Sequence, residues 1–265
     1  MSNSATRPAS AAALRVRLAR SAEDLFAAQR LRYRVFVQEM GGDGPLVDHE
    51  QGLERDILDP IFDHLLLIDE TRCAEAKDYV VGAYRLLPDS RIAQGGRFYC
   101  DDEFDLAPLR RSGRRLLELG RSCVDPAYRG GIGMLQMWQG LAEYVLRHDI
   151  EILFGAASFP GDDPSRWAHA LSWLHQDYLA PQHLRVTARD PDSFVPLPPE
   201  LIDRKQATLQ TPALIRGYLR LGAFVGDGVF VDRAFKTTDL CIILDTSSLS
   251  AQARSLSRQA SGPLR

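Results

Sequence analysis

Apolar residues recur along the chain in two patterns: continuous or alternating runs, and residues spaced three to four positions apart. The first pattern is typical of β-strands and the second of amphipathic helices. Strands are expected at residues 14–18, 64–69, 79–87, 116–124, 151–157, 229–235 and 239–245. Helices are expected at residues 21–40, 134–147, 167–179 and 214–221, where Ser21 and Asp24 mark the start of the first helix and Gly41 and Gly42 its end.

The order of these elements predicts one α/β domain, a single mixed central sheet flanked by helices in a three-layer sandwich. Residues 64–69 and 79–87 are joined by a charged connection and are interpreted as a hairpin. Residues 185–203 are rich in proline and are interpreted as an excursion from the sheet. The domain is expected to span residues 14–245. Residues 1–13 and a basic tail at 246–265 are rich in serine and alanine and are expected to be loose.

Composition narrows the class of protein. The 265 residues carry a formal net charge of −3, which argues against general nucleic-acid binding. No apolar run is long enough to span a bilayer, and the N-terminus does not resemble a signal peptide, so a cytoplasmic enzyme is expected. The alternative is a peripheral contact between the tail and the inner membrane. Reduced thiols are expected because no Cys-x-x-Cys spacing occurs among the cysteines, Cys73, Cys100, Cys123 and Cys241.

The most informative stretch is residues 116–135, LLELGRSCVDPAYRGGIGML. It predicts an apolar strand, a break at Pro126, a glycine-rich turn and then a helix. Because proline cannot donate to a strand ladder, the strand is expected to splay away from its neighbour. A glycine-rich turn at a helix N-terminus presents N–H groups that bind phosphate-bearing molecules, and Gly130, Gly131 and Gly133 would let the backbone approach such a ligand. The alternative is a purely structural turn.

Within this stretch, VDPAYRGGIG at residues 124–133 resembles the acyl-donor loop of the Gcn5-related N-acyltransferases, V-x-P-x-Y-R-G-x-G-x-G. The resemblance implies the fold of that family and a donor site formed by Cys123, Val124, Arg129 and the three glycines. It also implies that a backbone N–H near Cys123 or Val124 stabilises the oxyanion. The loop is one residue short of the pattern after Arg129. This favours a donor carried on acyl carrier protein, whose pantetheine arm has one phosphodiester, over coenzyme A.

Further segments recur in the same order in two related families, the acyl-homoserine-lactone synthases and the ornithine-lipid N-acyltransferases. They are residues 31–36, 56–64, 80–88 and 118–122. The second resemblance covers almost the whole chain, including residues 98–104 and 214–226. It implies transfer of an acyl chain, typically 3-hydroxylated, from acyl carrier protein to the α-amine of ornithine, which gives lyso-ornithine lipid without a bound cofactor. The residues after Phe36 lack the tryptophan that the lactone synthases place there.

The implied chemistry suggests roles for three residues. An attacking amine must lose a proton, and Glu118 is predicted to accept it, directly or through a water. Its leucine neighbours suggest low-dielectric surroundings that would raise its pKa. The alternative is a structural ion pair with Arg121. Arg85 and Arg121 are predicted to hold an anionic group, either the acceptor carboxylate or the donor thioester region.

An acidic run, Asp56, Asp59 and Asp63, together with His64 and Arg34, is predicted to bind the acceptor, because a diamino acid carries a side-chain ammonium that a carboxylate can select. A solvated acidic loop and a structural histidine are the alternatives. No metal is expected, because acyl transfer needs none.

Two further sets of residues are candidates for binding the donor. Four arginines just before the central strand could dock an acidic carrier protein, or form a solvated loop: Arg110, Arg111, Arg114 and Arg115. Met134, Met137, Trp138 and Phe154 could line an acyl tunnel, or simply pack in the core. Cys123 is not expected to act as a nucleophile, because a bound amine attacks directly. The competing functions are a lactone synthase, acylation of another amino acid, and a non-catalytic binding module.

Overall fold

The computed structural model describes residues 13–72, 78–92, 96–129, 132–190 and 193–249. Its main sheet has eight strands, and all neighbouring strands within it pair antiparallel except β7 and β8. The order across the sheet is β1 (Leu14–Leu18), β4 (Asp63–Asp69), β5 (Val80–Pro88), β7 (Leu116–Val124), β8 (Ile152–Pro160), β12 (Thr237–Asp245) and β10 (Phe224–Val225), with β11 (Phe230–Asp232) beside β12. The mixed sheet and the hairpin of β4 and β5 are confirmed.

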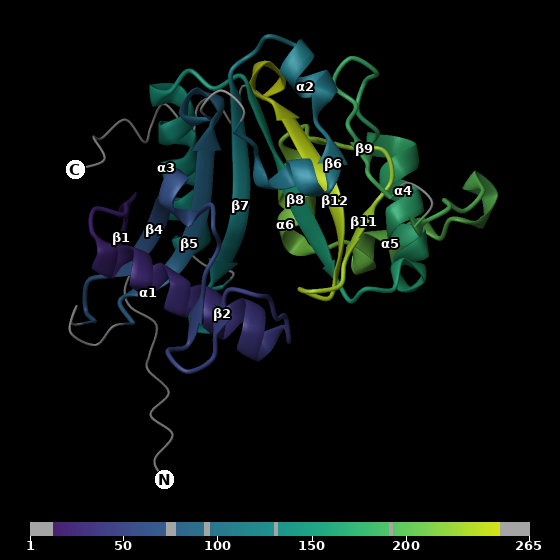
Figure 1. Ribbon diagram of the computed structural model, residues 1–265. Coiled ribbons are helices and arrows are strands. Elements are labelled where there is room, and N and C mark those ends of the chain that lie inside the picture. Colours follow the sequence, from purple (N-terminus) through teal and green to yellow (C-terminus); the bar gives the residue numbers. More distant parts are fainter. Residues whose placement is uncertain (1–12, 73–77, 93–95, 130–131, 191–192, 250–265) are drawn as a thin grey trace.

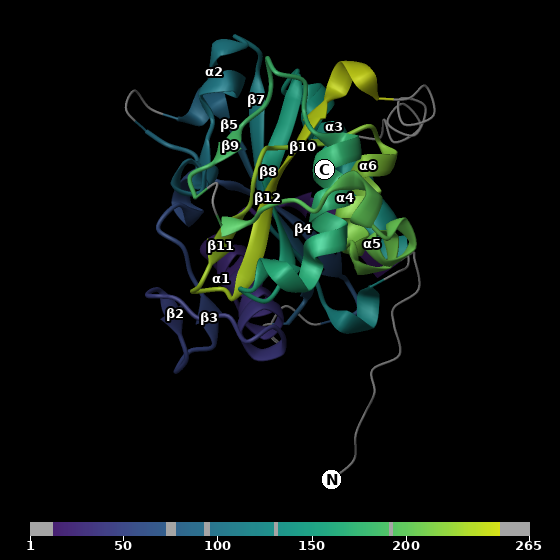
Figure 2. The same ribbon diagram turned by 90° about the vertical axis from the view of Figure 1, so that its right-hand side faces the viewer.

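Helices cover both faces of the sheet, as the three-layer prediction requires (Figures 1 and 2). On β4, Leu65 and Leu67 belong to a core cluster that includes residues of α3, whereas Leu66 and Ile68 pack in a cluster with α1 on the opposite face. This alternation is the side-chain period of a strand buried on both faces. The helices are α1 (Ala22–Arg32), α2 (Ala107–Arg111), α3 (Ile132–Arg147), α4 (Ala168–Tyr178), α5 (Arg204–Gln210) and α6 (Ala213–Arg220).

The sequence pattern did not indicate every element. The short helices α2 and α5, strand β10 and the two-residue strands β2 (Val47–Asp48), β3 (Leu53–Glu54), β6 (Phe104–Asp105) and β9 (Thr187–Ala188) were not expected. Their apolar runs are too short to show a period. The first helix starts as predicted, because the Ser21 side chain accepts a hydrogen bond from the Asp24 N–H. The predicted tails lie outside the described residues, apart from residue 13 and residues 246–249.

After Arg32 the first helix changes its geometry. Residues Tyr33–Glu39 form a π-helix, and the N–H of Met40 bonds to the carbonyl of Val35, five positions back, at 3.1 Å. Gly41 ends the helix with φ +74°, a conformation that glycine adopts without steric cost. The π-turns place Val35, Phe36 and Glu39 along one wall of a cavity of about 520 Å³.

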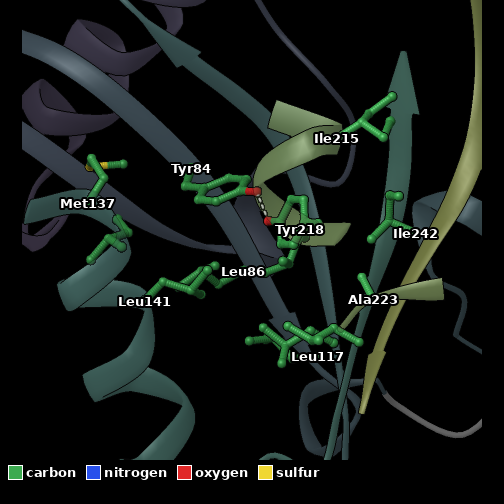
Figure 3. Packing of buried hydrophobic residues seen from close by; sticks show 14 of the residues in the cluster. Tyr84, Leu86, Leu117, Met137, Leu141, Ile215, Tyr218, Ala223 and Ile242 are labelled. Carbon is green, nitrogen blue, oxygen red and sulfur yellow. Dashed lines mark hydrogen bonds between the residues drawn. The ribbon is translucent and has the colours of Figure 1, made fainter. Parts of the chain in front are cut away.

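A splay was expected at Pro126, but the strands that part are β7 and β8, and they part well before that residue. These strands pair only at residues 116–118 of β7 and 152–154 of β8, and beyond that point they separate. Arg121 adopts φ +49°, and the register of β7 against β5 shifts between Gly120 and Cys123, so a β-bulge bends β7 at the splay. Above the splay, Tyr218 of α6 reaches Tyr84 of β5 and the two hydroxyls are hydrogen-bonded (Figure 3). This contact links the two halves of the sheet where their strands part.

Gly155 of β8 lets the backbones of β7 and β8 lie very close together at this point. A Cβ atom at residue 155 would lie 2.2 Å from the carbonyl oxygen of Leu119, which is backbone and cannot rotate away. Gly155→Ala is therefore expected to destabilise the fold by about 1–3 kcal/mol or more, as overpacking does. Gly44→Ala, whose new Cβ would meet nothing closer than 3.9 Å, is the matched control in urea unfolding. Equal stability of the two variants would contradict this account of the splay.

Candidate active site

A cavity of about 520 Å³ opens where β7 and β8 separate, a size typical of small-molecule sites. One wall is the bulged half of β7, residues 118–124, and the opposite wall is formed by residues 156–158 of β8 and residues 237 and 239 of β12. The π-helix and residues 212–214 at the start of α6 close the sides. Most lining side chains are apolar, and the charged ones are Glu118 and Arg121 of β7, Asp232 and Asp239 of β11 and β12, and Glu39 and Arg129. The cavity is thus an apolar channel with a polar centre.

The predicted donor loop forms one rim of this cavity. Cys123, Val124 and Arg129 line it. The Arg129 guanidinium makes two hydrogen bonds of 2.6 Å to the carboxylate of Glu39 on the π-helix, and its Nε donates to the carbonyl of Val124 at 2.9 Å. Burial raises the pKa of Cys123 to about 12, so this residue is a neutral thiol, in keeping with the expectation that it is no nucleophile.

The glycines of the loop are only partly described. Gly130 and Gly131 lie outside the described residues. Gly133 is buried against β4: a Cβ atom there would lie 2.9 Å from Leu67 Cδ2. Its lack of a side chain therefore serves helix–sheet packing, whereas the prediction assigned it to ligand approach. The loop itself is fixed to β4 through Tyr128, whose hydroxyl donates to Asp69 at 2.5 Å.

Glu118 is buried, lines the cavity and accepts backbone N–H bonds from Tyr99 at 2.8 Å and Cys100 at 2.6 Å. Burial raises the pKa of the Glu118 carboxyl, and the two N–H groups oppose part of that rise. The alternative of a Glu118–Arg121 ion pair is wrong, because Arg121 pairs with Glu54 at 3.2 Å and Asp56 at 3.3 Å.

Arg121 belongs to a network in which arginines and carboxylates alternate. The Arg32 guanidinium binds Glu54 and also Asp59 at 2.7 Å. Arg85 bridges Asp59 at 3.0 Å and Asp56 at 3.1 Å. Burial alone would raise the pKa of Asp59, but Arg32 and Arg85 hold it well below its usual range. Each arginine of this network pairs with two of its carboxylates. The full set is Arg32, Arg85, Arg121, Glu54, Asp56 and Asp59.

Only Arg121 of this network reaches the cavity. Its guanidinium lies between two aromatic rings, 4.8 Å from the Tyr99 centroid and 4.5 Å from the Phe235 centroid, which fixes its orientation. Arg85 is buried over the Phe62 ring at 4.3 Å and does not line the cavity. The network therefore holds Arg121 in place from the side that faces away from the cavity.

The other residues predicted to bind the acceptor lie away from the cavity wall. Asp63 accepts the Tyr144 hydroxyl at 2.7 Å and pairs with Arg91 at 2.9 Å. Burial lowers the pKa of His64, whose Nε2 donates to the Asp59 carbonyl at 3.0 Å, as in the structural alternative. Arg34 pairs with Asp78 at 2.5 Å beside the donor loop.

The four predicted docking arginines lie just before β7, at the end opposite to the donor loop (Figure 1). Arg110 pairs with Asp101 at 2.5 Å. Arg114 pairs with Asp245 at 2.6 Å, and the Nε of Arg115 donates to the carbonyl of Asp149 at 2.5 Å. Arg111 is exposed. Nine strand residues, roughly 30 Å at 3.3 Å each, separate these arginines from the donor loop.

Of the predicted tunnel residues, Met134 lines the large cavity. Met137 and Trp138 share with Met134 the lining of a small void of about 10 Å³, which also borders Ser122 and Val124 of β7. Phe154 packs edge-on against Phe98, with ring centroids 4.9 Å apart, and belongs to the core. The apolar side of the cavity thus continues toward α3.

The sequence prediction missed three carboxylates next to the cavity. Oxygen atoms of Glu103, Asp232 and Asp239 lie within 4.8 Å of one another, and Asp232 and Asp239 line the cavity. Burial raises the pKa of Asp239 to about 6 and that of Glu103 well above its usual range. The available signal was the acidic Asp239 directly before the apolar run of residues 240–244.

A mixed sheet whose parallel pair splays beside a strand–loop–helix donor turn defines an N-acyltransferase of the Gcn5-related class. In agreement, residues 31–139 match the family described as an acetyltransferase (GNAT) domain. Two relatives are similar over 90% of this chain, and each is named L-ornithine N(alpha)-acyltransferase: one from Rhodobacter capsulatus at 56% identity over 92% of its length, and one from Rhizobium meliloti at 43% over 82%. The chain belongs to the L-ornithine N(alpha)-acyltransferase family.

Solved structures are more distant. The N-acyl amino acid synthase FeeM from uncultured soil microbes is 12% identical with a TM-score of 0.49, and the alignment covers 91% of this chain and 97% of that one. Among the described residues, no helix has both the length and the apolar character to cross a membrane.

Proposed function

We propose that this protein transfers a fatty acyl chain, typically 3-hydroxylated, from acyl carrier protein to the α-amine of L-ornithine and so forms lyso-ornithine lipid. The observation that carries the proposal is the cavity at the splay, which joins the donor loop, a buried carboxylate and an apolar channel. The two relatives whose alignments cover 90% of this chain are named for ornithine acylation, and they support the choice of acceptor.

The donor thioester would lie along β7. Beyond Glu118 the edge of β7 that faces β8 has no paired strand, so its N–H groups are available to the thioester oxygen near Cys123 and Val124. The acyl chain would occupy the apolar part of the cavity, beside Val35 and Met134. The donor loop is one residue shorter than the acyltransferase pattern, which supports a pantetheine arm with a single phosphodiester.

In the reaction, the acceptor nitrogen attacks the thioester carbonyl carbon, the C–N bond forms, and the C–S bond breaks to release the pantetheine thiol. Glu118 would take the proton that the attacking amine loses and then return it to the departing thiolate, because it is the buried carboxylate on the β7 wall and its pKa is raised. Arg121 would bind the acceptor carboxylate, since its guanidinium faces the cavity in a fixed orientation.

The test is an acylation assay with purified protein and 3-hydroxyacyl–acyl carrier protein. Ornithine, lysine, glycine, glutamine and S-adenosylmethionine are offered separately, and products are followed by mass spectrometry. Acyl-ornithine is expected to dominate. An acyl-homoserine lactone would assign the protein to the signalling enzymes, and no product from any acceptor would favour a binding module. The same chain on coenzyme A is the donor control, and equal rates with it would contradict the choice of carrier protein.

A further inference from the structure

Three carboxylates beside the cavity take no part in the chemistry described so far. Glu103 follows the helical turn Tyr99–Asp102, Asp232 ends β11 and Asp239 lies on β12. Their oxygen atoms lie within 4.8 Å of one another. We call these residues the carboxylate triad. It joins two segments that are more than a hundred residues apart in the sequence, at a place where two of its members face the cavity.

The triad is not satisfied by the protein alone. Glu103 and Asp239 are 2% and 4% exposed, yet Glu103 Oε2 and Asp239 Oδ1 have no hydrogen-bond partner. A buried acceptor without a partner is costly, and native proteins rarely keep one unless a ligand or ion completes it. Two such atoms in one cluster, beside a cavity, point to a cationic ligand.

We infer that the carboxylate triad binds the side-chain ammonium of the acceptor amino acid and so selects a diamino acid; this inference rests on the proposed function. An ammonium group carries three N–H donors around a compact charge, and the triad offers an oxygen from each of three carboxylates. The guanidinium of Arg121 lies close enough to favour the charged form of Glu103 and Asp239. Because Arg121 is itself positive, the triad suits a monovalent cation better than a divalent one. A second, divalent positive charge at that place would be repelled more strongly.

The neighbouring charges support the same arrangement. Asp56 and Asp59, which the sequence suggested for this role, are already paired with arginines. With the acceptor carboxylate on Arg121 and its side-chain ammonium on the triad, the α-carbon would be held between two fixed points. The α-amine would then be free to approach Glu118 and the donor. One binding mode would therefore select the side-chain amine and leave the α-amine exposed to the donor.

The experiment compares ornithine with norvaline, which has the same carbon chain and no side-chain amine, in the wild type and in Asp239→Asn. The variant is expected to raise KM for ornithine about 10-fold to 100-fold, the effect of losing a charge-assisted hydrogen bond. Its kcat/KM for norvaline is expected to stay within about twofold of the wild-type value. Glu103→Gln is expected to act in the same direction. Asp162→Asn, at an exposed residue that does not line the cavity, is the matched control.

Each other outcome overturns the inference. An equal loss of kcat/KM with ornithine and norvaline would mean that the triad acts in chemistry or folding. An unchanged KM for ornithine would mean that the triad does not bind the acceptor. Activity that disappears with EDTA and returns with Mg²⁺ would make the triad a metal site. A wild type that acylates norvaline as well as ornithine would refute the proposed acceptor itself, and the inference would fall with it. Because asparagine removes a buried charge without changing shape, thermal unfolding of the variant is expected to match or exceed that of the wild type.

Discussion

Glu118→Gln is expected to lower kcat/KM for ornithine acylation by about 10²–10⁴-fold, the usual contribution of a positioned general base. The glutamine keeps the shape of the side chain and one of its two acceptors for the N–H groups of Tyr99 and Cys100. It cannot take a proton from the amine. Burial raises the pKa of Glu118. The wild-type rate should therefore increase as the pH rises through that pKa, whereas the rate of the variant should not show this increase.

Two measurements separate chemistry from folding in this variant. Urea unfolding is expected to show a loss of about 1–3 kcal/mol, because the new NH₂ group faces a backbone donor. Glu200→Gln, at an exposed residue, controls for the substitution. Activity within tenfold of the wild type, with the pH dependence unchanged, would mean that Glu118 only anchors residues 99 and 100.

Arg32→Met is expected to destabilise the fold by about 3–5 kcal/mol, because removing one partner of a buried ion pair leaves a buried charge uncompensated. Glu54 would keep only Arg121 and Asp59 only Arg85, so the network would hold three carboxylates and two arginines. Arg32 is fully buried and is the residue that joins Glu54 to Asp59. Methionine is shorter than arginine but is unbranched, flexible and of comparable volume, so the loss reports charge more than volume. Urea unfolding measures the effect.

Arg15→Met is the matched control for this prediction. Arg15 pairs with Glu70 at the surface, where both side chains are about half exposed, and such pairs contribute roughly 0–1 kcal/mol. If both variants lost less than about 1 kcal/mol, the buried network would have no structural role. The position of Arg121 would then need another explanation.

The sequence predicted the parts of this molecule that local pattern determines. The main strands and helices follow from apolar periodicity. A splay was expected at Pro126, but β7 and β8 part earlier, after Glu118, where a β-bulge bends β7. Glu118 was found because a carboxylate stands out on an apolar strand that leads into a recognisable loop. The resemblance to an acyl-donor loop predicted a site at Cys123, Val124 and Arg129, and these residues line the cavity.

What the sequence could not show depends on tertiary pairing. Asp56 and Asp59 look like free carboxylates along the chain, but Arg32 and Arg85, brought close by α1 and β5, neutralise them. The carboxylate triad is hidden for the opposite reason: Asp232 and Asp239 lie on the paired strands β11 and β12, and Glu103, far away in the sequence, joins them only in the folded protein. Charge balance of this kind is a property of the fold and not of any window of residues.

The π-helix at Tyr33–Glu39 has a consequence for how the substrate cavity can vary among relatives. Each residue advances an α-helix by about 100°, whereas the wider π-turn absorbs one extra residue over the same length. Deleting one residue within Tyr33–Glu39 would restore α-helical geometry without breaking the helix. It would turn Val35, Phe36 and Glu39 to new directions and detach Glu39 from Arg129 on the donor loop. Insertions and deletions in this helix can therefore reshape the cavity, with no change to Glu118, Arg121 or the strands that carry them.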